Sequence, residues 1–203
     1  MNITVLGCGN IGGTLGKKWA AAGHTVTFGV RHPDDAETQQ QVASYGPNAS
    51  LTSIAEAIPP APVVLFAIPG SAVEAAVAEN AAALAGKIVI DATNKIGQPL
   101  THNLAAFSAH APSALWFRAF NTLGWENFEN PRYGDEVADL FFCGAPGASR
   151  AVVEGLISDV GPRPVYIGGP DQADNVDALL RLWMALVRGQ GLGRGVAFKM
   201  LRR

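Results

Sequence analysis

The sequence predicts an α/β fold in which helices cover both faces of a doubly wound, mostly parallel β-sheet. Two observations indicate this class. Apolar runs of strand length alternate with helical stretches along most of the 203 residues. The run at 62–68 is continuously apolar, which is typical of a strand that is buried on both faces.

The first element is a strand, glycine loop and helix within 2–23. An apolar strand precedes Gly7, Gly9 and Gly12, whose spacing is G-x-G-x-x-G, and a helix predicted over 14–22 follows. A tight turn, close approach to a pyrophosphate and close packing of helix on strand each leave no room for a Cβ. Because the free N–H groups at the helix start can bind phosphates, the unit predicts a Rossmann-type dinucleotide-binding fold.

A basic residue follows the second predicted strand. NAD-selective sites typically have Asp or Glu there, which binds the ribose 2′-hydroxyl and repels a 2′-phosphate. This chain has Arg31, which can hold a phosphate through two parallel hydrogen bonds, and His32 adds a donor when protonated. The pattern favours NADP over NAD. The alternative is that Arg31 is a solvated cation whose field Asp34 and Asp35 weaken.

Composition limits the class of partner. Charged residues make up 16% of the chain and the net charge is −2, and without a basic run neither nucleic acid nor an anionic membrane is predicted as a partner. No apolar run reaches membrane-spanning length and no secretory signal is evident, so a cytoplasmic location is expected. Cys8 and Cys143 are too few and too far apart for a disulfide framework or a zinc site. Small-molecule coenzymes are the predicted partners.

The elements after the first unit continue the alternation up to residue 120. In order, we expect a helix over 34–45, a weak strand at 49–51, a short helix opened by the capping box Ser53-Ile-Ala-Glu56, the strand at 62–68, an alanine-rich helix over 71–85, and strands at 87–91 and 115–120.

Beyond residue 120 the pattern changes, so residues 1–120 are predicted as the dinucleotide-binding domain and 121–203 as a smaller C-terminal region. That region either extends the same sheet or stands apart from it. Its apolar residues at helical spacing are typical of core packing, and a homodimer contact would explain them too. The elements expected in it are strands at 139–143 and 164–167 and helices over 148–160 and 172–188.

Three strand ends are predicted to meet on the nicotinamide side, because ligands bind beyond the carboxyl ends of parallel strands. They are 67–70, 93–95 and 121–122. Turn chemistry alone would explain Asn94 and Asn121 equally well. The predicted cofactor-binding residues are Gly7, Cys8, Gly9, Asn10, Ile11, Gly12, Val30, Arg31, His32, Ala67, Ile68, Pro69, Asn94 and Asn121.

No catalytic residue or metal ligand is predicted. Reduction of a carbonyl commonly uses a Tyr with a Lys four residues later, or a His held by a carboxylate. None of the three tyrosines has such a lysine, and none of the four histidines has an evident partner in the sequence. Hydride transfer between two stacked rings needs no such group, and a protein that only binds NADP(H) needs none either.

Six short motifs together resemble a known family. They are similar to motifs of the NADP oxidoreductases that use the deazaflavin coenzyme F-420, whose fold also resembles the reductase domain of the STEAP metalloreductases. The resemblance implies reversible hydride transfer between NADP(H) and the deazaflavin, and a C-terminal tail that helps to form the cleft for the second coenzyme. The motifs are Gly7-Cys-Gly-Asn-Ile-Gly12, Phe28-Gly-Val-Arg31, Phe66-Ala-Ile-Pro69, Asp91-Ala-Thr-Asn94, Ala119-Phe-Asn-Thr122 and Gly189-Gln-Gly-Leu-Gly193.

Three positions depart from that family's pattern for the 2′-phosphate. Members that bind NADP typically have threonine where this chain has Cys8, serine where it has Val30, and often a cation where it has Asp35. A relaxed preference between NADP and NAD therefore stays open. So do two other functions: an NADPH reductase of another acceptor, such as a flavin or quinone, and a non-enzymatic NADP(H) sensor.

Overall fold

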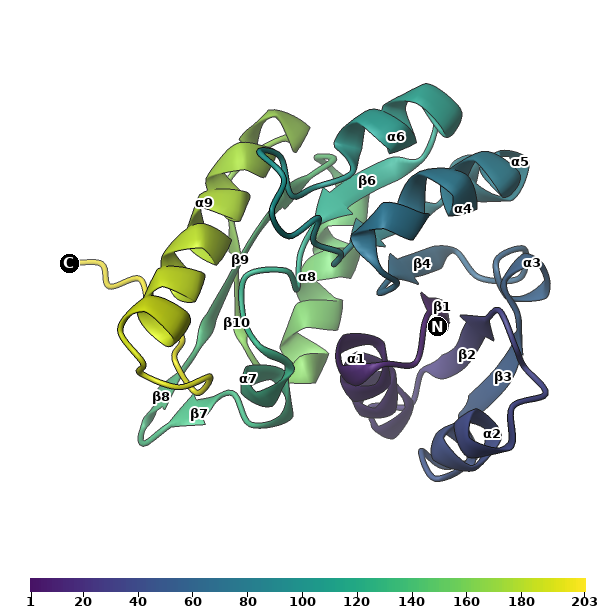
Figure 1. Ribbon diagram of the computed structural model, residues 1–203, viewed down its shortest axis with the longest axis horizontal. Helices are drawn as coiled ribbons and strands as arrows, with labels where there is room; N and C mark the ends of the chain where they lie inside the picture. Colours follow the sequence, from purple (N-terminus) through teal and green to yellow (C-terminus); the bar gives the residue numbers. More distant parts are fainter.

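The structure is a computed structural model that describes residues 1–203. One eight-stranded sheet lies between two layers of helices (Figure 1). A separate two-stranded hairpin consists of β7 (Arg132–Tyr133) and β8 (Glu136–Val137). The strands of the large sheet are β1 (Asn2–Leu6), β2 (Thr25–Val30), β3 (Ala49–Ser53), β4 (Val63–Phe66), β5 (Ile88–Asp91), β6 (Leu115–Arg118), β9 (Asp139–Gly144) and β10 (Arg163–Tyr166).

Six parallel strands, in the order β3-β2-β1-β4-β5-β6, form most of the sheet. The next strand, β9, runs antiparallel to β6, with Phe117 opposite Gly144 and Arg118 opposite Cys143. β10 then pairs parallel to β9. The predicted doubly wound, mostly parallel sheet is confirmed, and the strands beyond residue 120 extend it. The strand order reverses between β1 and β4, where an open α/β sheet forms its ligand crevice.

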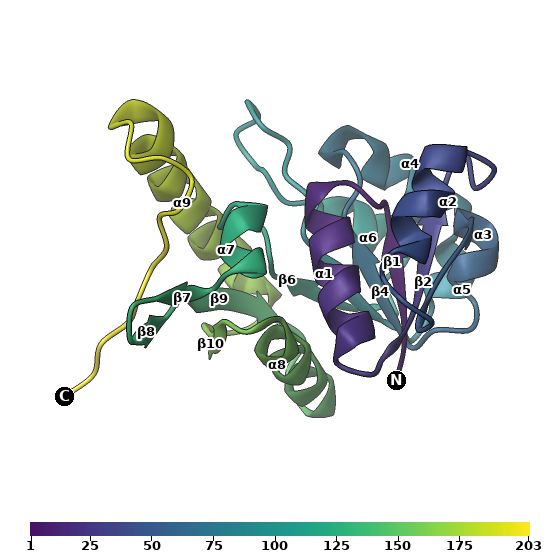
Figure 2. The ribbon, with the colours of Figure 1, turned by 90° about the horizontal axis from the view of Figure 1, so that it is seen from below.

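The helices cover both faces of the sheet (Figure 2). Side chains of β4 alternate between two apolar clusters, with Val63 and Leu65 in one and Val64 and Phe66 in the other. This alternation is what a strand with two buried faces requires. The helices are α1 (Asn10–Ala21), α2 (Ala36–Ala43), α3 (Ile54–Ala57), α4 (Val73–Glu79), α5 (Ala81–Leu84), α6 (Leu104–His110), α7 (Trp125–Glu129), α8 (Ala148–Val160) and α9 (Ala173–Met184).

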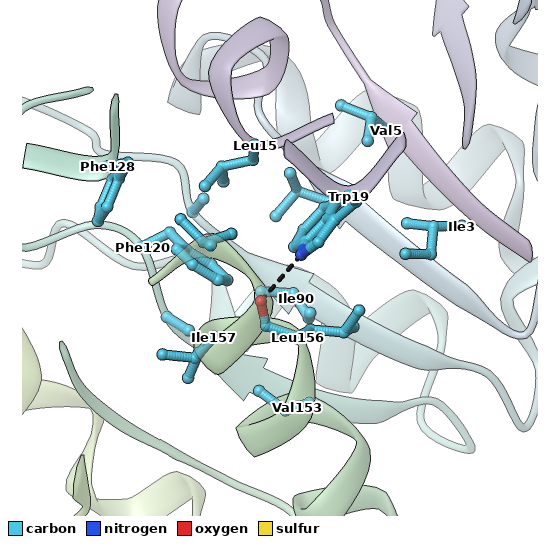
Figure 3. Close-up of a cluster of buried hydrophobic side chains, with 14 of the residues drawn as sticks. Ile3, Val5, Leu15, Trp19, Ile90, Phe120, Phe128, Val153, Leu156 and Ile157 are labelled. Carbon is cyan, nitrogen blue, oxygen red and sulfur yellow. Dashed lines mark hydrogen bonds between the residues drawn. The ribbon is translucent and has the colours of Figure 1, made fainter. Parts of the chain in front are cut away.

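Trp19 of α1 joins the two halves of the chain. Its side chain is fully buried, and its Nε1 donates a hydrogen bond to the Leu156 carbonyl oxygen of α8 at 2.9 Å (Figure 3). The indole also packs edge-on against Phe120, with ring centroids 5.8 Å apart, and Phe120 packs in the same way on Phe128. The larger apolar cluster is therefore continuous from α1 to α8.

Several helix limits differ from the sequence expectation. α1 begins at Asn10, four residues earlier than predicted, because Gly9 in the loop already occupies the N-cap position. The alanine-rich segment is not one helix. It divides at Asn80, which has φ −115° and ψ 17° and whose Nδ2 donates to the Ala76 carbonyl oxygen. An asparagine amide competes in this way with the helical backbone pattern.

The last predicted helix is also shorter. α9 ends at Met184, and a π-helical turn over Ala185–Gly189 follows. In contrast, the helix over 148–160 has the predicted limits, and the capping box of Ser53 and Glu56 opens α3. No helix of the structure combines the length and the apolar character that crossing a membrane would require.

Gly16 lies where α1 packs on β2, and its replacement tests this contact. A Cβ at Gly16 would lie 2.3 Å from Cζ of the buried Phe28 ring. We expect Gly16→Ala to lower the free energy of unfolding by roughly 1–3 kcal/mol, because overpacking forces the ring to shift. Urea unfolding followed by circular dichroism measures the change.

Gly155 of α8 is the matched control. A Cβ there meets no atom within 4 Å, and the residue is exposed. Gly155→Ala should raise the free energy of unfolding by about 0.5–1 kcal/mol, since alanine costs less backbone entropy than glycine in a helix. Equal stability of the two variants would contradict the assigned packing.

Candidate functional site

The glycine loop between β1 and α1 brings three backbone segments together. Gly7 has φ +93°, and a Cβ there would lie 2.7 Å from the Ala67 carbonyl oxygen. A Cβ at Gly12 would lie 2.1 Å from the Gly7 carbonyl oxygen. Both positions therefore require glycine for reasons internal to the protein: a left-handed conformation at one and close backbone packing at the other.

Gly9 differs from its two neighbours in the motif. Its φ of −68° and ψ of −168° are open to any residue, and a Cβ there would meet no protein atom within 4 Å. Gly9 is the N-cap of α1 and offers no side-chain cap, so N–H groups of the first turn have no partner from a cap. Open space beside unpaired N–H groups at a helix start is the arrangement that binds a pyrophosphate.

A cavity of about 650 Å³ adjoins this loop. It extends from the loop to the ends of β2 and β4 and to one side of α4. Most of the predicted cofactor-binding residues line it, and the structure thus brings together Gly7, Cys8, Gly9, Val30, Arg31, His32, Ala67, Ile68 and Pro69.

The end of β2 supplies the charges of this cavity. Arg31 and His32 are exposed there, and Arg31 takes part in none of the ion pairs of the structure. Asp35 is the N-cap of α2 and accepts a hydrogen bond from Thr38 N at 2.9 Å. Hydrogen bonds from Thr38 hold the pKa of Asp35 below its ordinary value. The free guanidinium can bind an anion, and the adjacent carboxylate opposes this.

Sequence reasoning missed the side of the cavity that α4 provides. Ala72, Ala75, Ala76 and Glu79 line it, at the three- and four-residue spacing of one helix face. The small side chains of the three alanines leave room for a ligand. The spacing was visible in the sequence, but nothing there indicated that this face turns towards the glycine loop.

The ends of β4 and β5 meet, as predicted. A Cβ on Gly70 would lie 2.7 Å from the Asn94 carbonyl oxygen, and Asn94 Nδ2 donates to the Asn121 carbonyl oxygen at 3.0 Å. A second cavity of about 680 Å³ lies between residues 69–71 and the loop at 94–100. It shares Pro69 with the first cavity, and Lys95 is the only ionisable residue that lines it.

A buried guanidinium joins these strand ends to α9. Arg118, at the end of β6, is fully buried and donates to the Asp91 carbonyl oxygen, the Thr93 carbonyl oxygen and Asn94 Oδ1. Its Nε lies 2.9 Å and its Nη2 2.8 Å from Asp177 Oδ1 of α9. Its Nη1 also lies 3.4 Å from Asp91 Oδ1. Two carboxylates and one guanidinium are thus buried together behind the strand ends.

The two asparagines predicted at this edge have different environments. Asn94 is half-buried and lines the second cavity, but its amide is held between Arg118 and Asn121. Asn121 is 2% exposed and donates from Nδ2 to Asp177 Oδ1 at 3.1 Å. Of the remaining predicted residues, Asn10 lies beside the loop in a third, smaller hollow that Trp125 of α7 also lines.

The expectation that no histidine has a partner is wrong for three of the four. His110 Nε2 lies 4.0 Å from Glu74 Oε1. His24 Nε2 lies 2.9 Å from Asp159 Oδ2, and His102 Nε2 lies 3.1 Å from Asp174 Oδ1. The partners lie on helices elsewhere in the chain, Asp159 on α8, Asp174 on α9 and Glu74 on α4, so separation in the sequence hid them. None of the three histidines lines the cavities described above.

The two cysteines are both free thiols. Burial raises the pKa of Cys143 to about 12, so this thiol stays protonated and inert at neutral pH. Cys8 lies in the glycine loop and lines the first cavity.

The C-terminal tail packs against α7 and α9. Trp183 Nε1 donates to the Val196 carbonyl oxygen at 2.7 Å, and Asn127 Nδ2 donates to the Arg194 carbonyl oxygen at 2.9 Å. The Arg194 side chain pairs with Glu126 at the start of α7. These contacts hold the glycine-rich segment 189–195 close to α7, whose Trp125 lines the third hollow together with residues of the glycine loop.

Comparison with known proteins identifies relatives. Residues 2–95 match the family described as NADP oxidoreductase, coenzyme F420-dependent. Among curated proteins, the chain is 25% identical over 186 residues to Metalloreductase STEAP3 of Rattus norvegicus, an alignment that covers 89% of this chain and 36% of that protein. The chain thus spans about a third of the length of this relative.

Two solved structures are similar along most of the chain. One is assigned as an F420-dependent NADP-reductase of Arthrobacter sp. FB24; it is 28% identical, with a TM-score of 0.87 and 100% of both chains covered. The other is the reductive aminase of Aspergillus terreus in complex with NADPH4, cyclohexanone and allyl amine. It is 24% identical with a TM-score of 0.69, covering 93% of this chain and 62% of that one, and shows a common fold alone.

These findings confirm two predictions: the resemblance to the NADP oxidoreductases and the Rossmann-type α/β fold. NADP(H) is the nucleotide of the matching family.

Gly9→Val separates binding from folding at the loop. The valine side chain would enter the open space beside the helix start, so we expect no measurable binding of either NADP⁺ or NAD⁺ by isothermal titration calorimetry. The free energy of unfolding should fall by no more than about 1 kcal/mol, the cost of a poor N-cap.

Gly12→Ala is the comparison for the loop. Its Cβ would collide with the Gly7 carbonyl oxygen, so this variant should lose more stability than Gly9→Val in urea unfolding. Nucleotide binding by Gly9→Val at the affinity of the parent protein would refute the assigned pyrophosphate position.

Proposed function

We propose that this protein is an NAD(P)-dependent oxidoreductase that transfers hydride between NADP(H) and the deazaflavin coenzyme F-420. The observation that carries the proposal is the open position at Gly9, where a glycine that the protein itself does not require adjoins unpaired helix N–H groups. The family match of residues 2–95 supports the second coenzyme.

The residues of the first cavity fit a dinucleotide. The pyrophosphate would lie beside Gly9 and the first turn of α1, and the adenosine would lie between the end of β2 and the alanine face of α4. The nicotinamide would then lie near Pro69 and Asn94, at the carboxyl ends of β4 and β5.

Arg31 supports NADP as the nucleotide. It is exposed at the end of β2, and no carboxylate of the protein neutralises it in an ion pair. A free guanidinium binds a phosphate through charge-assisted hydrogen bonds. Asp35 lies in the same cavity as a fixed negative charge, which would weaken the preference for a 2′-phosphate.

The second cavity, where the nicotinamide would lie, has few side chains that could act as a general acid or base. Neither histidine nor tyrosine nor carboxylate lines the second cavity, where Lys95 is the sole ionisable group. The bound nucleotide would supply the hydride, and the protein would hold the two rings together and exclude water. This division suits an acceptor that is itself a redox coenzyme.

The C-terminal region would complete the acceptor site. We propose that residues 121–203 form a smaller unit whose Trp125 and glycine-rich segment 189–195 lie along one side of the cleft. The contacts of Arg194 with Glu126 and of Asn127 with the Arg194 carbonyl oxygen support this, because they hold the segment against α7.

A second candidate is an NADPH reductase of another acceptor. The similarity to Metalloreductase STEAP3 favours it, since that relative is described by a different acceptor. The nucleotide site would be the same, and only the residues around the second ring would differ.

Anaerobic mixing with NADPH and oxidised F-420 tests the reaction. We expect the visible absorbance of the deazaflavin to bleach as NADPH is oxidised, at a rate proportional to protein concentration. NADH, and a free flavin or quinone in place of F-420, are the parallel reactions. Turnover with a flavin or quinone alone would support the second candidate, and nucleotide binding without any turnover would overturn both.

Arg31→Ala tests the nucleotide preference. We expect the affinity for NADP⁺ to fall about tenfold or more, because a lost charge-assisted hydrogen bond contributes ~1.5–3 kcal/mol. The affinity for NAD⁺, which lacks the phosphate, should hardly change. Isothermal titration calorimetry measures both constants.

Arg181→Ala, which removes an exposed cation on α9, controls for net charge. It should leave both affinities unchanged. If Arg31→Ala weakened NADP⁺ and NAD⁺ equally, the guanidinium would not bind the 2′-phosphate.

A further inference from the structure

The turn after β6 holds a strained residue. Phe120 has φ 62° and is the only residue other than glycine with a positive φ. It is fully buried, and its ring packs between Trp19 and Phe128. Strained backbone persists where the surrounding structure fixes it, and such positions cluster at functional sites. The strained turn fixes the position of the next residue, Asn121.

Of the two polar atoms of the Asn121 side-chain amide, one has a hydrogen-bond partner and the other has none. Nδ2 donates to Asp177 Oδ1, which also accepts from Arg118, and the backbone carbonyl oxygen accepts from Asn94 Nδ2. Oδ1 has less than 1 Å² of exposed surface and no hydrogen-bond partner. Because the carboxylate fixes Nδ2, the amide cannot turn over to exchange its two ends, and the buried acceptor stays unpaired at a cost to stability.

Two other buried side-chain atoms also lack a hydrogen-bond partner, and their environments differ from that of Asn121 Oδ1. Trp116 Nε1 belongs to the middle of β6, where the indole packs in the smaller apolar cluster. Glu126 Oε2 belongs to a partly exposed carboxylate whose other oxygen binds Arg194. Of the three atoms, only Asn121 Oδ1 lies at the carboxyl end of the parallel strands, where nucleotides bind in this class of sheet.

A ligand that pairs with Asn121 Oδ1 must bring a hydrogen-bond donor. Asn94, which bonds to the Asn121 carbonyl oxygen, lines the cavity next to Pro69, so the nicotinamide end of a dinucleotide would lie next to this amide. The carboxamide of a nicotinamide ring carries an NH₂ group, and no other part of that ring donates a hydrogen bond. Entry of the ring would have to displace the side chains that cover the oxygen.

We propose that Asn121 Oδ1 accepts a hydrogen bond from the carboxamide NH₂ of the nicotinamide ring, and so selects this ring and fixes which face it presents. Asp177 and Arg118 act as positioning residues, because they hold the amide in the orientation that leaves Oδ1 unpaired. The inference rests on the proposed binding of NADP(H) but not on the identity of the hydride acceptor.

An analogue that lacks the NH₂ group tests the bond without measuring activity. In 3-acetylpyridine adenine dinucleotide phosphate a methyl group replaces the NH₂ at nearly the same size. We expect the parent protein to bind NADP⁺ about tenfold more tightly than this analogue, as for one hydrogen bond to a buried acceptor. Isothermal titration calorimetry measures both, with 2′,5′-ADP as a ligand that lacks the ring altogether.

Asn121→Ala should reduce the preference for NADP⁺ over the 3-acetylpyridine analogue to within about twofold. It should leave the affinity for 2′,5′-ADP unchanged. If Asn121→Ala does not fold, Asn121→Ser is measured instead, because the shorter serine hydroxyl does not reach the position of Oδ1. Asn103→Ala is the matched control. It removes another buried amide of the same network, one that donates to Thr93 Oγ1 at 2.8 Å, and should keep the tenfold preference.

The outcomes separate this inference from the proposed function. If the parent protein binds NADP⁺ and the analogue equally, or if Asn121→Ala keeps the preference, the assignment of Asn121 is overturned while nucleotide binding stands. If Asn103→Ala also loses the preference, the effect comes from the loosened network and the assignment likewise falls. Failure of NADP⁺ and 2′,5′-ADP to bind at all would overturn the proposed function itself.

Discussion

The buried guanidinium of Arg118 is the contact on which the architecture of this site depends. It stands at the end of β6 and binds the last residue of β5 and the loop after it through the Asp91 and Thr93 carbonyl oxygens. It also binds the amide of Asn94, and α9 through Asp177. Removing one partner of such a buried group leaves an uncompensated charge, which destabilises a protein far more than the loss of a surface ion pair does. The strand ends that face the proposed nicotinamide position, and the helix that closes the C-terminal half, are therefore held by one side chain.

Local signals account for what the sequence predicted well. The glycine spacing, the continuously apolar strand and the capping box each act within a few residues, and the structure has all three. The division of the alanine-rich helix at Asn80 was missed because alanine propensity outweighed a single asparagine in the prediction. The antiparallel direction of β9 was not predictable, since a strand of the same apolar pattern can pair in either direction.

In the candidate site, too, the features set by local sequence were predicted and those set by the packing of distant segments were not. Residues of the glycine loop and of the β2 and β4 ends line one cavity because strand ends in a parallel sheet share one edge. The alanine face of α4 and the acidic partners of Arg118, His24 and His102 escaped prediction, because each depends on how distant segments pack. Arg118 itself was read only as part of an apolar strand, since no sequence pattern distinguishes a buried arginine from a solvated one.

The contact between Trp19 and Leu156 has a consequence for the order of folding. These residues are 137 positions apart, and at a synthesis rate of about 5–20 residues per second the second follows the first by on the order of 10 s. During that interval β1, α1 and β2 can assemble, but the apolar side of α1 that faces α8 has nothing to cover it. Until α8 is made, the nascent chain therefore exposes this tryptophan face, and exposed apolar surface of this kind favours aggregation.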